Sequence, residues 1–177
     1  MASWKSRGLR GSMLEEMINY TNLKYRETKL ALIQKVPTPI TPIDIDKTSR
    51  HITLAYFEKK STVDYIGVVQ GIPVCFDAKE CGVDTFSLNN VHEHQIDFMK
   101  EFEEQNGVAF ILIYFKKHDT YYYLTFKRLL EFWNRALEGG RKSFRYDELD
   151  LSYVIPVQNS ICVHYLEILQ KDLACRE

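Results

Sequence analysis

The stretches Ser61-Thr62-Val63-Asp64-Tyr65-Ile66-Gly67 and Val74-Cys75-Phe76-Asp77-Ala78-Lys79-Glu80 decide how the rest of the chain is interpreted. Both are rich in β-branched and aromatic residues, and Gln70-Gly71 between them favours a tight turn, so the sequence predicts a β-hairpin. Side chains alternate between the two faces of a strand, so Asp77 and Lys79 point the same way. The hairpin can then bring Asp64 beside Asp77, which places two carboxylates and one ammonium on one face of a sheet.

This arrangement of charges predicts a metal site and a hydrolytic function. Two carboxylates this close repel each other unless a cation lies between them. Ligation by oxygen alone favours a hard ion, so we expect Mg²⁺, with Mn²⁺ as a substitute. A lysine beside such an ion suits phosphodiester hydrolysis, because its ammonium can orient the attacking water and stabilise charge on the phosphate. The alternative is a surface hairpin with scattered charges, since the pattern Asp-x-Lys is common.

Length and composition are typical of one compact globular domain. The chain has 177 residues, of which 45% are hydrophobic and 27% are charged, and we expect a flexible basic N-terminus over 1–11 and a single domain over 12–177. No apolar run is long enough to span a membrane, and the first residues lack the apolar core of a signal peptide. The four cysteines, at positions 75, 81, 162 and 175, form no C-x-x-C pair, so we expect a reduced, cytoplasmic location.

The charge balance is nearly neutral. The formal net charge is −1 and the isoelectric point is about 6.5, which argues weakly against nucleic-acid binding because a basic surface is its usual sign. Positive residues nevertheless gather before Val36 and again between Lys116 and Arg145. The composition is therefore compatible with a locally basic face on a neutral protein.

The order of the expected elements predicts an α/β (α+β) fold with a mixed central sheet flanked by helices. We expect helices over 12–26, 91–105, 127–137 and 163–173, strands over 30–36, 51–57, 108–115 and 121–125 beside the central hairpin, and a loop over 80–87. Ser12 and Glu15 have the spacing of a capping box at the start of the first helix. Glu15 is thus a capping carboxylate or an active-site residue, and both roles can hold because a helix N-terminus favours an anion.

Two further side-chain types near the hairpin are candidates for chemistry. Gln95, on the same predicted helix face as His92 and Met99, is near enough to hold a water molecule at the metal. The alternative for Gln95 is solvation of the helix surface. Cys81 could serve as a nucleophile, but no histidine is clearly paired with it, so a structural thiol is favoured.

The remaining clusters favour structural roles. Zinc binding by His92-Glu93-His94 with the nearby cysteines is disfavoured, because residues two apart on a helix lie on different faces. The aromatic residues of Tyr121-Tyr122-Tyr123 and Phe132-Trp133 could stack on unpaired bases. Their spacing is more typical of a hydrophobic core.

The chain resembles the RecU Holliday-junction resolvases of bacteria and their phages, from Gly8 onward. The resemblance rests on a series of short motifs in one order: Leu14-Glu15, Ile18-Asn19, Lys35-Val36-Pro37-Thr38-Pro39, Ala55-Tyr56-Phe57, Ser61 to Tyr65, Phe76 to Glu80, Leu88 to Gln95, Phe132-Trp133 and Gly140 to Ser143. It implies a nuclease fold of the PD-(D/E)-x-K type, like that of restriction endonucleases, with a protruding stalk over about 40–52. It also implies a homodimer that resolves four-way DNA junctions by Mg²⁺-dependent symmetric paired nicks in recombination and repair.

The resemblance also implies roles for individual residues. The metal ligands would be Thr62, Asp64, Asp77 and Gln95, and Lys79 would stabilise the transition state. Glu15 would complete the catalytic group, and the expected DNA contacts are Arg7, Arg10, Lys35, Lys47 and Arg50. The family usually has Glu at the position of Asp77, and the stalk here is shorter and less basic. Recombinase or branch-migration proteins are further expected partners, and a junction-binding accessory protein without obligatory cleavage is the alternative function.

Overall fold

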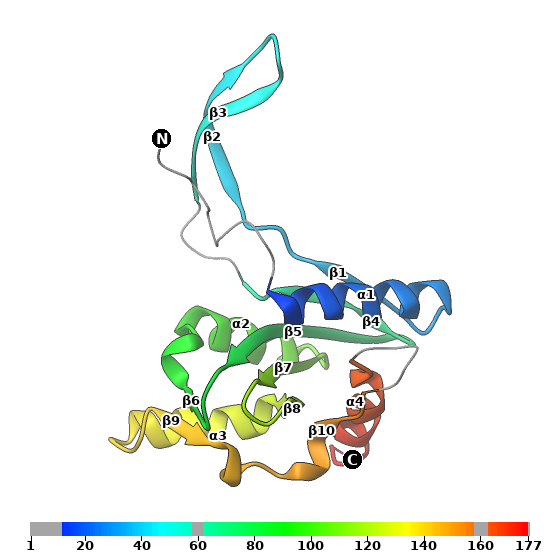
Figure 1. Cartoon of the computed structure of the whole chain (residues 1–177), viewed down its shortest axis with the longest axis vertical. Helices are drawn as coiled ribbons and strands as arrows, with labels where there is room; N and C mark the ends of the chain where they lie inside the picture. The colour runs from blue at the N-terminus through cyan, green and yellow to red at the C-terminus, as the bar shows by residue number, and fades with distance from the viewer. Residues whose placement is uncertain (1–11, 58–61, 158–162, 177) are drawn as a thin grey trace.

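The computed structural model of the chain describes residues 12–57, 62–157 and 163–176 (Figure 1). A six-stranded sheet forms its centre, in the order β1-β4-β5-β7-β8-β10. These strands are β1 (Ala31–Lys35), β4 (Tyr65–Val69), β5 (Ile72–Cys81), β7 (Val108–Phe115), β8 (Thr120–Thr125) and β10 (Val154–Ile155). The β5–β7 pair is parallel and the other pairs are antiparallel. The mixed α+β fold expected from the sequence is therefore confirmed.

In the part of the chain that the structure describes, four α-helices cover the two faces of this sheet. The helices α1 (Met13–Glu27) and α4 (Tyr165–Ala174) pack on one face, and α2 (Glu93–Glu104) and α3 (Phe126–Leu137) pack on the other. The central strand β7 contributes to both layers, because Phe110 and Leu112 join the α1–α4 core while Ile111 and Ile113 join the α2–α3 core. Burial on both faces explains the nearly continuous apolar run of this strand.

A row of stacked rings crosses four neighbouring strands of the sheet. Tyr65 of β4 stacks on Phe76 of β5 at 4.8 Å between ring centroids, Phe76 stacks on Phe110 of β7 at 4.7 Å, and Phe110 stacks on Tyr123 of β8 at 4.3 Å. All four residues are fully buried. Such cross-strand aromatic pairs stabilise a particular strand register.

The β4–β5 hairpin has the predicted turn. Gln70 and Gly71 both have positive φ values, 47° and 90°, which is the backbone of a type I′ turn and suits glycine at the second position. Gly67, farther back in β4, permits a close approach to β1, because a Cβ atom there would lie 2.2 Å from the carbonyl oxygen of Leu32. Local backbone chemistry and sheet packing therefore agree on this hairpin.

A long two-stranded ribbon projects from the body of the protein (Figure 1). It consists of β2 (Ile40–Asp46) and β3 (His51–Phe57), which pair antiparallel. The expected protrusion over 40–52 is thus part of a hairpin that continues to Phe57. The strand expected over 51–57 is present, but it is almost wholly exposed, because it pairs with β2 and does not join the central sheet.

The loop expected over 80–87 is also largely wrong. The strand β5 continues to Cys81, and the short strand β6 (Thr85–Ser87) pairs with β9 (Ser143–Arg145). Three-residue strands carry too few residues to show a periodic pattern. Short 3₁₀ helices follow at η1 (Leu88–Asn90), η2 (Tyr146–Glu148) and η3 (Leu151–Tyr153). In the described parts of the chain, no helix is long and apolar enough to cross a membrane.

Candidate active site

The carboxylate of Asp77 is the centre of the candidate site. It is fully buried, and it accepts a hydrogen bond from the backbone N–H of Asp64 at 2.9 Å and one from Nε2 of Gln95 at 2.6 Å. The ammonium of Lys79 lies 3.0 Å from its Oδ2 atom, as the alternation of side chains along β5 predicted. Burial of a carboxylate is costly unless it is paired and hydrogen-bonded, and these three partners meet that requirement.

Asp64 is fixed by contacts with β5 and with the residue that follows β1. It lies one residue before β4, not within the strand as the sequence pattern suggested, and its Oδ2 atom accepts a hydrogen bond from the backbone N–H of Ala78 at 2.9 Å. Its own carbonyl accepts a hydrogen bond from Val36, just beyond β1, at 2.8 Å. Asp64 and Asp77 therefore brace each other, since each carboxylate binds a backbone N–H from the other's segment.

The site disfavours two full negative charges. The pKa of Asp64 is raised from 3.8 to about 6, first by burial and then by the neighbouring Asp77, while the Ala78 N–H and Lys79 act in the opposite direction. Glu15 also raises this pKa, so its negative charge acts on the same site. A divalent cation fits this donor set, because it would stabilise the ionised form of Asp64 beside Asp77.

The number of acidic ligands is nevertheless small. Among the described residues, no group of three or more His, Cys, Asp or Glu side chains is arranged to hold a metal ion. An ion at this site would rely on two aspartates, with its other ligands from neutral oxygens, water or substrate.

Gln95 is buried on α2, and its side chain reaches Asp77 from this helix. Its Oε1 atom accepts a hydrogen bond from the backbone N–H of His92 at 3.1 Å, and its Nε2 atom donates to Asp77. The amide therefore presents its nitrogen to the carboxylate, and a direct metal contact through Oε1 would require it to turn. Met99 lies buried on the same helix, whereas His92 is the exposed N-cap residue, so the predicted shared face is wrong for His92.

A second charged pair lies at the start of α1. The Glu15 carboxylate is 2.7 Å from the ammonium of Lys35 at the end of β1. The cap of α1 is the hydroxyl of Ser12, which accepts a hydrogen bond from the Glu15 N–H at 3.2 Å. The Glu15 side chain is thus free of the capping bond and joins Lys35 near Asp64.

The other predicted site residues lie at varied distances from this centre. Thr62 is half-buried, two residues before Asp64. Lys47 and Arg50 are exposed in the turn of the β2–β3 ribbon, well away from the sheet (Figure 1). The predicted DNA contacts Arg7 and Arg10 lie outside the described residues.

The structure also shows the roles of Cys81, of the aromatic clusters and of Glu80. The thiol of Cys81 is buried and donates to the carbonyl of Val83 at 3.1 Å, as a structural cysteine would. Phe132 and all three residues of Tyr121-Tyr122-Tyr123 are buried, which confirms a core role. Glu80 was missed: its carboxylate accepts a hydrogen bond from the N–H of Leu14 at 3.1 Å. Glu80 directly follows Lys79, so strand alternation could have predicted that its side chain lies on the other face of the sheet.

Comparisons with known proteins agree with one another. The family model described as RecU, Recombination protein U, matches residues 9–171. A protein of Oceanobacillus iheyensis named Holliday junction resolvase RecU is 43% identical over 167 residues, covering 92% of this chain and 85% of that protein. Proteins of the same name from Bacillus cereus (strain B4264) and Staphylococcus aureus (strain JH9) are 41% and 38% identical, covering 80% and 93% of this chain and 72% and 81% of their own lengths.

Among solved structures, one of Archaeoglobus fulgidus Hjc, described as a Holliday junction resolvase from an archaeal hyperthermophile, matches with a TM-score of 0.43 at 5% identity. The match covers 66% of this chain and 78% of that chain. On the family model and the sequence identities, the chain belongs to the RecU family.

The raised pKa of Asp64 predicts that Asp64→Asn stabilises the metal-free protein. The folded state binds the Asp64 proton more tightly than the unfolded state does. The resulting contribution to the free energy of unfolding is complete below about pH 4 and is lost as the pH rises through about 6. At pH 7.5 in EDTA, we expect the variant to unfold with a free energy about 1–3 kcal/mol higher than the wild type, as measured by urea denaturation. The Asn oxygen can still accept the Ala78 hydrogen bond.

The same comparison at pH 4.5 supplies the control, because the folded wild type is then largely protonated at Asp64 and the advantage should shrink. Added Ca²⁺ at pH 7.5 should stabilise the wild type more than the variant. A variant that is less stable than the wild type at both pH values would contradict the raised pKa of Asp64.

Proposed function

We propose that this chain is a structure-selective endodeoxyribonuclease that resolves Holliday junctions by symmetric paired nicks in DNA recombination and repair. The observation that carries the proposal is the buried Asp77 carboxylate, held between Asp64, Lys79 and Gln95. The names of the relatives support the same reaction and the same substrate, four-way junction DNA.

In this proposal the cofactor is Mg²⁺, with Asp64 and Asp77 as its protein ligands and Thr62 and Gln95 contributing directly or through water. When bound, the ion supplies Lewis-acid activation of water and neutralises charge on the scissile phosphate. The ammonium of Lys79 orients the attacking water and stabilises the negative charge that develops on the phosphate. Asp77 keeps that ammonium in place at 3.0 Å.

The DNA contacts in this proposal extend from the site to the ribbon. Lys35 lies beside the site, although its pairing with Glu15 means that a phosphate would compete with that carboxylate. Lys47 and Arg50 lie in the turn of the β2–β3 ribbon, which would be the stalk. Together with Arg7 and Arg10, these residues would bind phosphates without reading sequence. A cytoplasmic location and recombinase or branch-migration partners belong to the same proposal.

The ribbon also favours a second candidate function. Its strands expose large apolar side chains, Ile43, Ile45, Ile52, Leu54 and Tyr56, which the hydrolytic reaction does not need. Exposed apolar patches commonly mark interaction sites. A junction-binding accessory role could therefore exist alongside cleavage, and Asp77→Asn, which should bind junctions but not cut them, would separate the two roles.

The primary test is cleavage of a synthetic mobile four-way junction. We expect paired nicks in opposing strands with Mg²⁺ or Mn²⁺, and none with EDTA. Linear duplex of the same sequence is the control substrate. Equal cutting of duplex and junction would indicate a general nuclease, and absence of cutting with both metals would refute the enzymatic proposal.

Lys79→Ala should separate catalysis from binding. We expect cleavage to fall by about 10²–10³-fold, because single electrostatic stabilisers of a transition state have effects of that size. Junction affinity in Ca²⁺ should change little, because phosphate contacts spread over many basic residues dominate binding. Lys100→Ala, at an exposed position on α2, is the matched control. Equal losses of affinity and rate in Lys79→Ala would make Lys79 an ordinary phosphate contact.

A homodimer is required by the symmetry of the proposed reaction. Paired nicks on two opposing strands need two sites related by a two-fold axis, as in dimeric DNA readers. We expect a mass of about twice 20.8 kDa by light scattering at micromolar concentration. The chain between Tyr56 and Tyr65 is the proposed contributor to the interface, and Tyr56 is exposed in the single chain. A strict monomer that makes coordinated paired nicks would contradict this arrangement.

A further inference from the structure

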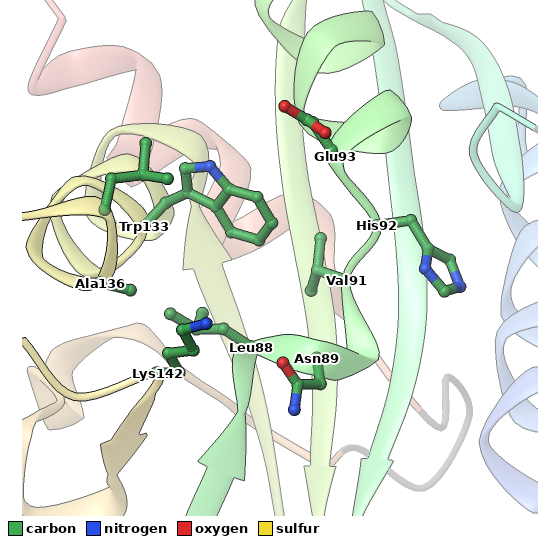
Figure 2. Close-up of a pocket in the computed structure, with 9 residues that line it drawn as sticks. Leu88, Asn89, Val91, His92, Glu93, Trp133, Ala136 and Lys142 are labelled. Carbon is green, nitrogen blue, oxygen red and sulfur yellow. The ribbon is translucent and has the colours of Figure 1, made fainter. Parts of the chain in front are cut away.

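A pocket of about 300 Å³ lies where η1, the start of α2 and the helix α3 meet. Figure 2 shows its lining, with the indole of Trp133 on α3 pointing toward Val91 and with Lys142 near Leu88 at the base. The residues that form it come from two regions far apart in the sequence, 88–93 and 133–142. Hydrolysis at Asp77 makes no direct use of them.

The small β6–β9 ladder builds this pocket. It pairs Ser87 with Ser143, and the backbone N–H of Leu88 donates to the carbonyl of Lys142 at 3.1 Å. These bonds hold the Gly140–Ser143 segment against η1. Three motifs of the family resemblance, Leu88 to Gln95, Phe132-Trp133 and Gly140 to Ser143, therefore contribute to one pocket.

The walls suit a flat aromatic group with polar edges. Trp133 is half-buried and offers a ring face, while Leu88 and Val91 supply apolar surface. Asn89 and Lys142 are exposed at the pocket, and among the described residues neither side-chain amide nor ammonium has a hydrogen-bond or ion-pair partner. Glu93 lies at the top of the pocket in Figure 2, away from Lys142, so a phosphate would be accepted only at the Lys142 end.

The pocket connects to the candidate active site through two hydrogen bonds. The backbone N–H of His92, which lines the pocket, donates to Gln95, and Gln95 donates to Asp77. A group bound in the pocket would therefore be linked to Asp77 through one backbone amide and the side chain of Gln95. The volume is at the small end for ligand sites in proteins, which suits one base and excludes a duplex.

We propose that this pocket receives one unpaired nucleobase of the DNA strand being cut, stacked on Trp133, with Asn89 at its polar edge and Lys142 on the adjoining phosphate. Stacking on an aromatic side chain accepts any base, and Asn89 can favour one base by hydrogen bonding. This inference rests on the proposed function. In it, the pocket holds the nucleotide of the substrate that lies beside the cut.

The test combines protein variants with abasic junctions. In one set of junctions, a single base at a time is removed from the positions flanking the cut. We expect the wild type to cut one of these junctions about 10-fold more slowly than the intact junction. Trp133→Ala should cut the intact junction about 10-fold more slowly and should lose nothing further at that abasic position, because the two changes remove the same contact.

Controls distinguish stacking from a structural role. Trp133→Phe keeps a stacking ring and should restore most of the rate. Asn134→Ala, at the exposed neighbouring position on α3, should behave as the wild type. The proposal would be overturned if the rate losses from Trp133→Ala and from base removal add at every abasic position. It would also be overturned if Trp133→Ala cuts at the wild-type rate, which is the outcome expected if the pocket holds a partner protein.

Fluorescence tests the pocket independently of cleavage. The chain has two tryptophans, so Trp4→Phe leaves Trp133 as the only one. In EDTA, the intact junction should quench Trp133 emission, and the critical abasic junction should quench it less. If the wild type cuts no junction, the proposed function fails, but a single-stranded oligonucleotide still decides the pocket: quenching supports it, and unchanged emission up to millimolar strand overturns it.

Discussion

The stack of Tyr65, Phe76, Phe110 and Tyr123 is the interaction on which the candidate site depends. It pairs Tyr65 directly with Phe76 across β4 and β5, and these residues immediately precede or follow the two aspartates in sequence. A slip of one residue would turn every side chain of a strand to the other face. The register that buries the rings is therefore the register that places Asp64 against Asp77 and Lys79 toward α2.

This placement is maintained against electrostatic repulsion. The folded state keeps Asp64 in a partly buried position beside a fully buried carboxylate, with a pKa of about 6 as the consequence. Hydrophobic burial and ring stacking in the two cores supply the free energy that tolerates this conflict. A site held in this way by its surroundings does not need a cation in order to form, but it is arranged to favour one.

Sequence patterns predicted most of what depends on local periodicity. The hairpin with its Gln70-Gly71 turn, the buried strand β7 and the four helices follow from spacing alone, and alternation placed Lys79 on the same face as Asp77. The remaining strand pairings were not accessible in this way. The strand β3 pairs with its neighbour β2, and β6 pairs with the distant β9, and neither choice leaves a signal in short polar or exposed strands.

The start of α2 shows why the missed pairing matters for the site. The strand β6 of this ladder leads through η1 to the His92 N-cap of α2, and the first turn of α2 carries both a wall of the pocket and Gln95. Because Gln95 is held by the His92 backbone and by Asp77 together, a shift of this turn would reach the buried carboxylate through one side chain. The carboxylate of Asp77 is therefore connected to the β6–β9 ladder through Gln95 and the start of α2, as well as to its own strand.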